Sequence, residues 1–285
     1  MGISFKEVSH YYRGLKKKDI TIALDKINLD IEGKGEFVSI VGKTGSGKST
    51  MLEHMNGLSL PSEGTVQIFD YVITPKKNKN PKMKDIRKRV GYVFQFPEYQ
   101  LFEETVLKDI MFAPMNFGMK EAEAKKKAIE VAKLLGIQSL LNKSPFNLSG
   151  GQMRKCAIAG ILAYAPDILL LDEPTRGLDP KAAADIMRIF YDLHKKTGIT
   201  IVLISHDMNI VYEYSTRIVV LNDSHLTYDG NKVELFKSGI YKDNHLTKPD
   251  VLKLIDYLNK KMGYSIDYNT FNLQELIEKV VKLHE

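Results

Sequence analysis

The chain has 285 residues, of which 44% are hydrophobic and 27% are charged, and its formal net charge is +6. This composition excludes a low-complexity or disordered chain, and the length suits one large α/β domain or a domain with a small appendage. No apolar run approaches the roughly 20 residues of a membrane-spanning helix. Because charge stands where a signal peptide would be apolar and Cys156 is the single cysteine, we expect a cytoplasmic protein without disulfide bonds.

Much of the positive charge lies in two lysine runs, at residues 16–18 and 76–84. Basic segments that bind single-stranded nucleic acid interleave aromatic residues on which bases stack, and neither run contains one. Both runs are interpreted as solvated loops that favour solubility. We therefore expect no nucleic-acid partner.

The N-terminal segments at residues 3–8 and 27–31 alternate between apolar and polar residues, which predicts a half-exposed antiparallel sheet. Three later segments, at residues 37–41, 168–171 and 199–204, are nearly continuously apolar, as in parallel strands buried on both faces. Each of the three ends in a polar cluster. Because the carboxyl ends of parallel strands meet at one sheet edge, we expect these clusters to share one site.

Helical patterns occupy two other regions. Residues 120–135 space leucine and isoleucine among alanine, lysine and glutamate, which predicts a helical insertion between the first two buried strands. Near the C-terminus the pattern predicts two amphipathic helices, around residues 251–258 and 273–280, with Asn272 and Glu275 as a capping pair. A short C-terminal helical extension is therefore expected.

A glycine-rich segment follows the first buried strand and leads into a helical stretch, so its spacing and its context both fit a P-loop. Glycines let backbone N–H groups curl around phosphates, Lys48 reaches the β- and γ-phosphate oxygens, and the Ser49 hydroxyl holds Mg²⁺. The sequence therefore predicts binding of ATP or GTP. The residues of this loop are Gly42, Lys43, Thr44, Gly45, Ser46, Gly47, Lys48, Ser49 and Thr50.

A pair of acidic residues, Asp172 and Glu173, ends the second buried strand. At the sheet edge that carries the P-loop, Asp172 is placed to hold Mg²⁺ through water and Glu173 to polarise the attacking water. Without the P-loop the pair would be unremarkable surface carboxylates. Together the two motifs predict nucleotide hydrolysis.

A pentapeptide between these two motifs precedes an amphipathic segment, so that its serine can cap a helix and its glycines let backbone amides approach an anion closely. This pentapeptide resembles the signature motif of ABC ATPases, and it has the same place in the order of motifs. The resemblance extends over about residues 3–237. The residues of the motif are Leu148, Ser149, Gly150, Gly151 and Gln152.

The remaining ABC elements are matched one at a time. Gln95 resembles the Q-loop glutamine, which in the family touches Mg²⁺ and faces the transmembrane partner. The segment that ends at Asp179 resembles the D-loop, and His206 resembles the switch histidine that contacts the γ-phosphate. An aromatic residue is expected to stack on adenine, and by resemblance we choose Tyr12, with its neighbour Tyr11 as the alternative.

The resemblance implies an α/β P-loop fold with an ABC ATPase domain at residues 1–240. This domain has an N-terminal antiparallel β subdomain and a helical subdomain at about residues 96–160, and a helical extension follows at residues 241–285. ATP and Mg²⁺ are the implied cofactors, and Glu173 with Lys48, Gln95 and His206 is the implied catalytic set. Departures from the family pattern are the atypical residues Met153, Cys156 and Arg176.

In ABC ATPases the signature serine of one subunit completes the P-loop site of another. A second ATPase subunit, an identical copy or a paralogue, is therefore an implied partner.

Residues 94–106 resemble the ATPases of energy-coupling-factor transporters, and more closely the second of their two paralogues. Such transporters import vitamins, or cobalt and nickel in related systems. The implied partners are a transmembrane coupling subunit and, through it, a substrate-capture membrane subunit, with the chain peripheral at the cytoplasmic face of the cell membrane. Two alternatives stay open: the ATPase of a binding-protein-dependent importer, and a soluble ABC ATPase outside transport.

The same segment carries more apolar surface than a solvated loop requires, which predicts a socket for a helix of the coupling subunit. Packing between the main and helical subdomains is the alternative. The residues concerned are Phe96, Tyr99, Leu101 and Phe102.

Overall fold

The computed structural model describes residues 2–14, 20–76 and 80–283. The lysine run at residues 16–18 lies outside the described residues, and so do residues 77–79 of the second run. Lys76, Lys82 and Lys84 of that second run are exposed, as the interpretation of a solvated loop requires.

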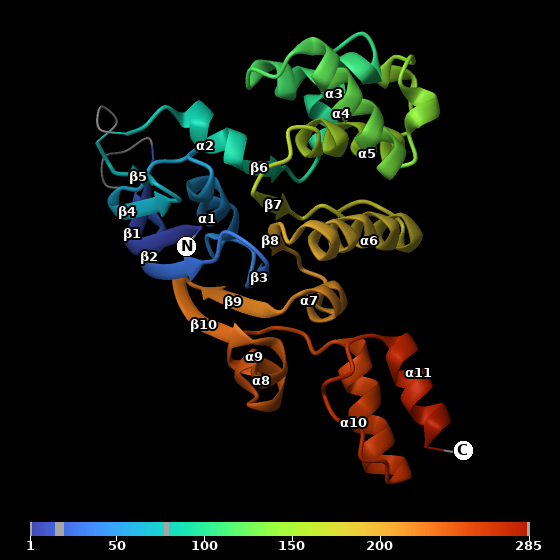
Figure 1. Ribbon diagram of the computed structural model, residues 1–285. Helices are drawn as coiled ribbons and strands as arrows, with labels where there is room; N and C mark the ends of the chain where they lie inside the picture. The colour runs from blue at the N-terminus through green and yellow to red at the C-terminus, as the bar shows by residue number, and fades with distance from the viewer. Residues whose placement is uncertain (1, 15–19, 77–79, 284–285) are drawn as a thin grey trace.

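A six-stranded sheet forms the centre of the molecule (Figure 1). The strands β9, β3, β8, β7 and β6 follow one another in parallel, and β10 is added antiparallel at one edge. Every residue of β3, β7 and β8 is buried, which confirms the predicted strands covered on both faces. The bounds are β3 (Phe37–Val41), β6 (Val90–Val93), β7 (Ile168–Asp172), β8 (Thr200–Ile204), β9 (Arg217–Asn222) and β10 (His225–Asn231).

A second sheet is antiparallel, as predicted, with the strand order β2-β1-β4-β5. The helix α1 (Lys48–Met55) packs between the two sheets, because its residues Met51 and Leu52 share one apolar core with Phe5 of β1 and Ile40 of β3. This packing fixes the start of α1 against the end of β3. The bounds are β1 (Ile3–Arg13), β2 (Ile20–Ile31), β4 (Glu63–Ile68) and β5 (Tyr71–Ile73), and α2 (Met83–Arg89) leads into β6.

A group of helices lies on one side of the central sheet, at the top right of Figure 1. The helix predicted over residues 120–135 is α4 (Glu121–Leu134), and it packs with α3 and α5. The helix α6 is also apolar on one side and buries Met187 and Phe190 in the core that these helices share with β7 and β8. The other bounds are η2 (Pro97–Gln100), α3 (Val106–Asn116), η3 (Gln138–Leu140), η4 (Pro145–Asn147), α5 (Gly150–Leu162) and α6 (Pro180–Thr197).

The C-terminal extension contains the two predicted helices, α10 (Asp250–Met262) and α11 (Leu273–Lys282), preceded by two short helices that the pattern did not predict, α8 (Lys232–Lys237) and α9 (Ile240–Asp243). Asn272 caps α11 by accepting from the N–H of Glu275 at 3.0 Å. The Glu275 carboxylate accepts from the N–H of Phe271, one residue before the expected position. The extension lies at the opposite end of the molecule from α3 and α4 (Figure 1).

The extension is packed on α7 (Met208–Tyr214) and on the central sheet. Leu252 and Ile255 of α10 share an apolar core with Val211 and Tyr212 of α7. At the start of α10, the backbone N–H of Asp250 donates to the side chain of Asn209 on α7 at 2.7 Å. Within the described residues, no helix is both long enough and apolar enough to span a membrane.

Candidate active site

The loop between β3 and α1 holds a backbone shape that only glycine allows at two positions. Gly42 has a φ of 147°, and a Cβ atom there would lie 2.0 Å from the carbonyl oxygen of Leu221. Gly47 has a φ of 98°, and a Cβ atom would lie 2.1 Å from the carbonyl oxygen of Ala23. Any side chain at either position would push the loop off its neighbouring strands. The sequence therefore shapes a tight loop at the carboxyl end of β3.

The outer side of this loop is open and polar. A Cβ atom at Gly45 would meet nothing within 4 Å, whereas the hydroxyl of Ser46 is buried and, within the described residues, has no hydrogen-bond partner. Lys48 is 6% exposed, and its Nζ atom donates to the carbonyl oxygens of Gly42 at 2.9 Å and Lys43 at 2.7 Å. A buried hydroxyl that has no partner among the described residues and an ammonium group that donates to neutral carbonyls are the features of an anion cradle.

Burial shifts the pKa of Lys48 in this loop and the pKa of Asp172 at the end of β7. Burial lowers the pKa of Lys48, and the negative charges of Glu173 and Asp172 oppose that shift. Burial also raises the pKa of Asp172, while hydrogen bonds from Tyr92 and Ser49 oppose the shift. The Tyr92 hydroxyl donates to Asp172 at 3.0 Å. Asp172 at the end of β7 thus lies within hydrogen-bond reach of Ser49 in the first turn of α1. The shared metal site at these two residues stays a prediction.

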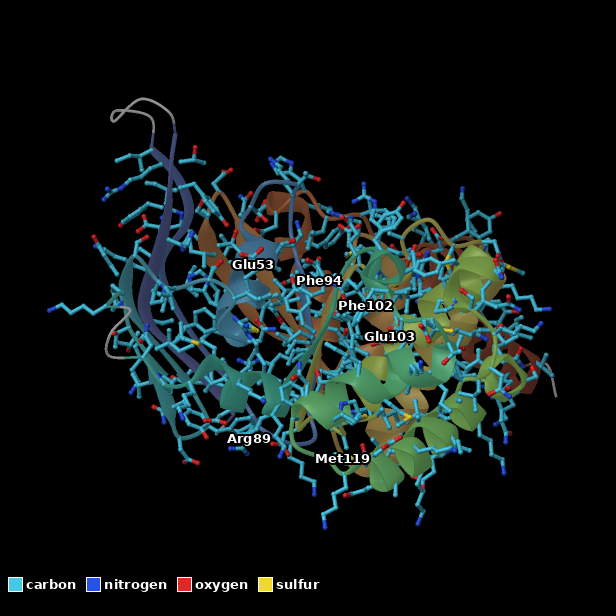
Figure 2. All side chains as sticks on the ribbon, turned by 90° about the horizontal axis from the view of Figure 1, so that it is seen from above. Glu53, Arg89, Phe94, Phe102, Glu103 and Met119 are labelled. Carbon is cyan, nitrogen blue, oxygen red and sulfur yellow. The ribbon has the colours of Figure 1, made fainter. Side chains whose placement is uncertain are left out.

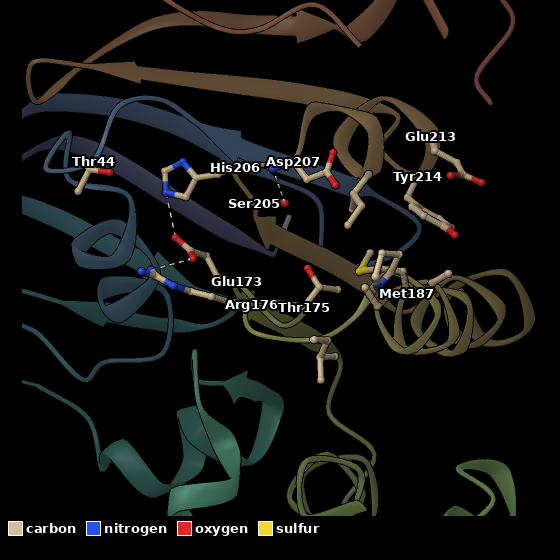
Figure 3. Close-up of a pocket in the computed structure, with 15 residues that line it drawn as sticks. Thr44, Glu173, Thr175, Arg176, Met187, Ser205, His206, Asp207, Glu213 and Tyr214 are labelled. Carbon is tan, nitrogen blue, oxygen red and sulfur yellow. Dashed lines mark hydrogen bonds and ion pairs between the residues drawn. The ribbon is translucent and has the colours of Figure 1, made fainter. Parts of the chain in front are cut away.

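Glu173 is the most heavily contacted side chain of the site. Its backbone is left-handed, with a φ of 48°, which is uncommon for a residue with a side chain. Its Oε1 atom lies 2.9 Å from Nε2 of His206, and its Oε2 atom accepts from Gln95 and from Arg176, each at 3.1 Å. The sheet edge therefore brings Gln95 and His206, two residues selected from the sequence, onto the carboxylate of Glu173. It adds Arg176, and Figure 3 shows the contacts of Glu173 with His206 and Arg176.

Glu173, Arg176 and His206 border a cavity of about 670 Å³. Its lining includes Thr44 from the loop, Glu173, and Ser205 and His206 from the end of β8. Asp207 caps α7 by accepting from the N–H of Asn209 at 2.8 Å, so the segment that carries His206 is anchored at its far side. The cavity leaves open space beside the carboxylate of Glu173.

Tyr12 lies beside the first turn of α1, as its proposed role requires. Its hydroxyl is 3.1 Å from the Thr50 hydroxyl, its ring meets the ring of His10 edge to face at 4.6 Å, and 46% of the residue is exposed. Tyr11 is less exposed, and its backbone N–H donates to the Ser62 hydroxyl at 3.0 Å. Of the two neighbours, Tyr12 is therefore the one with an open ring next to the loop.

The signature pentapeptide lies apart from this cavity. Ser149 caps α5 by accepting from the N–H of Gln152 at 3.4 Å, and the Gln152 side chain accepts from the N–H of Ser149 at 3.1 Å. A Cβ atom at Gly150 or Gly151 would meet nothing within 4 Å. Ser149, Gly151 and Gln152 line a separate pocket of about 320 Å³, and Asp179 caps α6. Within this chain, neither the pentapeptide nor Asp179 reaches the Glu173 cavity.

Two contacts of the site could not be found by the sequence reasoning. Arg176 was noted as a departure from the family pattern, but its contact with Glu173 was not foreseen. Tyr92 lies in β6 and reaches Asp172, 80 positions away, through the pairing of β6 with β7. Its only signal was a polar hydroxyl in an otherwise apolar strand.

The predicted apolar segment is partly exposed. Phe96 is 38% exposed, Tyr99 84% and Phe102 56%, but Leu101 is only 7% exposed and belongs to the core under the helices. The prediction was therefore wrong for Leu101, because a single apolar residue in a loop gives no periodicity that tells which side it faces. Figure 2 shows Phe102 in a row with Phe94 and Glu103, between the strand-rich part of the molecule and α3 to α5.

Comparisons with known proteins agree with one another. The protein-family profile described as ABC transporter matches residues 24–176. The energy-coupling factor transporter ATP-binding protein EcfA2 of Bacillus thuringiensis subsp. konkukian is 45% identical, over 99% of this chain and 96% of that protein. The structure of cbiO1 from Clostridium perfringens, part of the ABC transporter complex cbiONQ, is 33% identical with a TM-score of 0.72, over 89% of this chain and 98% of the other. A dimeric ATP-binding cassette in a post-hydrolysis state, bound to ADP and phosphate, is 33% identical with a TM-score of 0.71, over 80% of this chain and 98% of the other.

Proposed function

The chain belongs to the ABC transporter family, among the ATP-binding proteins of energy-coupling factor transporters, and we propose that its ATP hydrolysis powers uptake of a vitamin or a transition-metal micronutrient. The transport path lies in separate membrane subunits. One observation carries the assignment of hydrolysis: Lys48 of the glycine loop feels the charge of the Glu173 carboxylate, which side chains from several elements hold in place. A phosphate chain in the cradle would lie next to that carboxylate.

The nucleotide is held by the loop and by Tyr12. The phosphates take the open side at Gly45, where the Ser46 hydroxyl gains a partner and Lys48 exchanges loop carbonyls for phosphate oxygens. A phosphate beside Lys48 favours the charged form of its ammonium group. Binding of the nucleotide therefore offsets the cost of burying the Lys48 side chain. The exposed ring of Tyr12 stacks on the adenine.

Mg²⁺ fits the site on its donor chemistry. Ser49 offers a hydroxyl and Asp172 a carboxylate, which are the hard oxygen donors that this ion prefers. The amide nitrogen of Gln95 donates to Glu173, which leaves its amide oxygen for the metal. When bound with the nucleotide, the ion neutralises charge on the phosphate oxygens.

Hydrolysis is assigned to Glu173 as the group that accepts a proton from the attacking water. His206 at Oε1 and Gln95 at Oε2 hold the carboxylate in one orientation. Lys48 stabilises the negative charge that develops on the transferred phosphoryl group. Attack requires that one of the carboxylate oxygens exchange its present partner for the water.

A second ATPase subunit completes the site. The pair Gly150 and Gly151 opens α5 with an exposed backbone, and a Cβ atom at either position would meet no atom of the described residues within 4 Å. Glycine costs a helix about 1 kcal/mol relative to alanine, so its presence favours a close approach by something outside the chain. We assign residues 149–152 and Asp179 to the nucleotide on the partner's P-loop, the partner being a paralogue or an identical copy.

The membrane partners are assigned to the segment around η2. Phe96, Tyr99 and Phe102 are exposed apolar residues that a helix of a transmembrane coupling subunit would cover, and a substrate-capture subunit binds through that subunit. The chain is then peripheral at the cytoplasmic face of the membrane. The exposed apolar stripe of α11, formed by Leu273, Ile277 and Val281, suits pairing of the two ATPases.

The substitution Glu173→Gln tests the assignment of hydrolysis. It removes the proton acceptor and keeps the shape of the side chain, so steady-state hydrolysis falls by ~10² or more, while ATP still binds and holds a closed dimer. The matched control is Glu213→Gln, because Glu213 borders the same cavity on α7, away from Glu173 (Figure 3). Full hydrolysis by Glu173→Gln would exclude this residue as the base.

The membrane assignment is tested by identifying the proteins that copurify from gently solubilised membranes. A coupling subunit with a small substrate-capture protein is the expected result. Recovery of permeases that work with an external binding protein would favour a binding-protein-dependent importer. Recovery of no membrane protein would exclude transport.

A further inference from the structure

Arg154 is a buried charged residue that has no role in the nucleotide binding or hydrolysis proposed above. It lies in α5, two residues after the signature pentapeptide, and is 3% exposed. Its guanidinium group donates in two directions, to Glu98 on one side and to the segment that follows Glu173 on the other. A buried guanidinium is costly unless its donors are satisfied, and this one makes four hydrogen bonds.

The contact with Glu98 is bidentate. Nε donates to Oε2 of Glu98 at 3.0 Å, and Nη2 donates to Oε1 at 2.8 Å. The Glu98 side chain is 14% exposed, so water competes weakly for the pair. Parallel hydrogen bonds of this kind fix the direction of both groups as well as their distance. Glu98 lies in η2, and its neighbour in the chain is Tyr99, the most exposed aromatic residue of the segment.

The other side of the guanidinium holds the turn after Glu173. Nη1 donates to the carbonyl oxygen of Arg176 at 2.8 Å and to that of Pro174 at 3.4 Å. This turn carries Glu173 at its start and leads through residues 177–179 to α6. A displacement of the turn by nucleotide therefore acts directly on Arg154.

Three segments with separate tasks thus meet at one side chain: the start of α5, the aromatic segment around η2 and the turn after Glu173. Lysine could not replace the arginine, because a single ammonium group cannot hold a carboxylate bidentately and two carbonyls in a fixed plane. Glutamine could not replace Glu98 either, because it keeps the shape of the side chain but replaces one of the two acceptor oxygens by a donor.

We propose that Arg154 is a positioning residue that transmits the state of the nucleotide site to the aromatic segment around η2, with Glu98 as its partner. The inference rests on the proposed function, because it assumes that nucleotide binds at the P-loop. Arg154 touches neither nucleotide nor metal in this assignment. It makes the turn after Glu173, the start of α5 and the aromatic segment move together.

The absence of tryptophan from the chain allows a direct test. The substitution Tyr99→Trp places a single fluorophore on the aromatic segment, at a residue that is 84% exposed. The full-length reporter chain is titrated with the Mg²⁺ complex of a non-hydrolysable ATP analogue, adenylyl-imidodiphosphate. Tryptophan emission reports the segment, and displacement of a fluorescent ATP derivative reports nucleotide binding independently.

The expected result is a change in emission on nucleotide binding that Arg154→Gln or Glu98→Gln reduces by about fivefold or more, a typical size for coupling between two sites. Nucleotide affinity stays as in the parent reporter. Arg154→Lys restores charge without the planar fork and does not restore the response. If the arginine variants fold poorly, Glu98→Gln tests the same contact from its other side.

Arg89→Gln is the matched control. It breaks the Arg89–Asp167 ion pair, which is 2.7 Å long and joins distant parts of the chain but contacts none of the three segments. Its response stays at the parent level if the inference is right.

Three results would overturn the inference: an unchanged response in Arg154→Gln and Glu98→Gln, an equal loss in Arg89→Gln, or a parent reporter that binds nucleotide without any change in emission. Failure of the parent to bind nucleotide would overturn the proposed function and this inference together.

Discussion

The guanidinium of Arg176 lies 3.1 Å from Oε2 of Glu173 because the chain folds into a turn between them. The backbone N–H of Arg176 donates to the carbonyl oxygen of Glu173 at 3.1 Å, and the left-handed backbone at Glu173 starts the turn. The positively charged guanidinium of Arg176 therefore donates to the same oxygen of the proposed base that accepts from Gln95.

We predict that Arg176→Gln raises basal ATP hydrolysis. The Arg176 side chain is 56% exposed, and an ion pair at that exposure is worth at most about 1 kcal/mol, so the increase is limited to about fivefold. Arg176→Lys keeps the charge and serves as the control, with activity near that of the parent. Steady-state phosphate release from the purified dimer is the measurement. A fall in hydrolysis on Arg176→Gln would mean that the arginine assists the reaction instead of restraining it.

Ser149→Arg is predicted to separate binding from hydrolysis. Ser149 does not border the Glu173 cavity of its own chain, so ATP binds the P-loop of the variant with parental affinity. The bulky cation blocks the approach of the partner's nucleotide, and hydrolysis by the dimer falls by about tenfold or more, as for loss of a group that stabilises the transition state. Equilibrium binding of radiolabelled ATP to the monomer checks the first half. Lost binding in a well-folded monomer would place Ser149 at its own nucleotide.

Loss of the exposed aromatic side chains of Tyr99 and Phe102 is predicted to weaken assembly with the membrane subunits and to leave folding and ATP binding unchanged. Changing Tyr99 and Phe102 together to serine removes two exposed side chains, so the isolated chain keeps its folding and its ATP binding. Buried aromatic anchors of an interface contribute about 2 kcal/mol or more each, so affinity for the membrane subunits falls by ~10² or more. Val72→Ser, at an exposed apolar residue of β5 away from the segment, is the control. A double variant that copurifies with the membrane subunits as well as the parent would exclude the socket.

The buried side chain of His54 is predicted to lower the stability of the folded chain as the pH falls below about 6.5. Burial lowers its pKa from 6.5 to about 4, and the nearby His10 acts in the same direction. Between these two values the unfolded chain binds the proton and the folded chain does not, so the free energy of unfolding falls as pH drops from about 6.5 toward 4. The full effect of this group is about 3 kcal/mol, from 1.36 kcal/mol per pKa unit.

Urea unfolding at several pH values measures this effect. His54→Gln removes the titration, so the variant loses less stability between pH 7 and pH 5 than the parent chain does. His245→Asn is the control, because His245 is exposed and asparagine tolerates the left-handed backbone at that position. An equal pH slope in the parent and in His54→Gln would remove His54 as the cause.

The sequence predicted the fold, and it pointed to residues that the structure brings together at one sheet edge, because their signals are local. The buried strands are short apolar runs, and the P-loop, the signature and Glu173 are each recognisable within a few positions. Contacts between distant segments had no such signal. Arg154 meets Glu98 across 56 positions and Tyr92 meets Asp172 across 80, and both contacts depend on how strands and helices are ordered in space. Leu101 was misplaced for the same reason, since only the packing of the helices decides which side of its loop is buried.

The shared core of α7, α10 and α11 makes the C-terminal extension part of the support of the segment that carries His206. His206 lies two positions before α7, and Val211 and Tyr212 of that helix are buried partly by Leu252 and Ile255 of the extension. Fraying of α10 would expose these side chains to water and loosen the anchorage of His206. We therefore expect the extension and α7 to open together, so that a partner bound to the end of the chain would also slow local opening around His206.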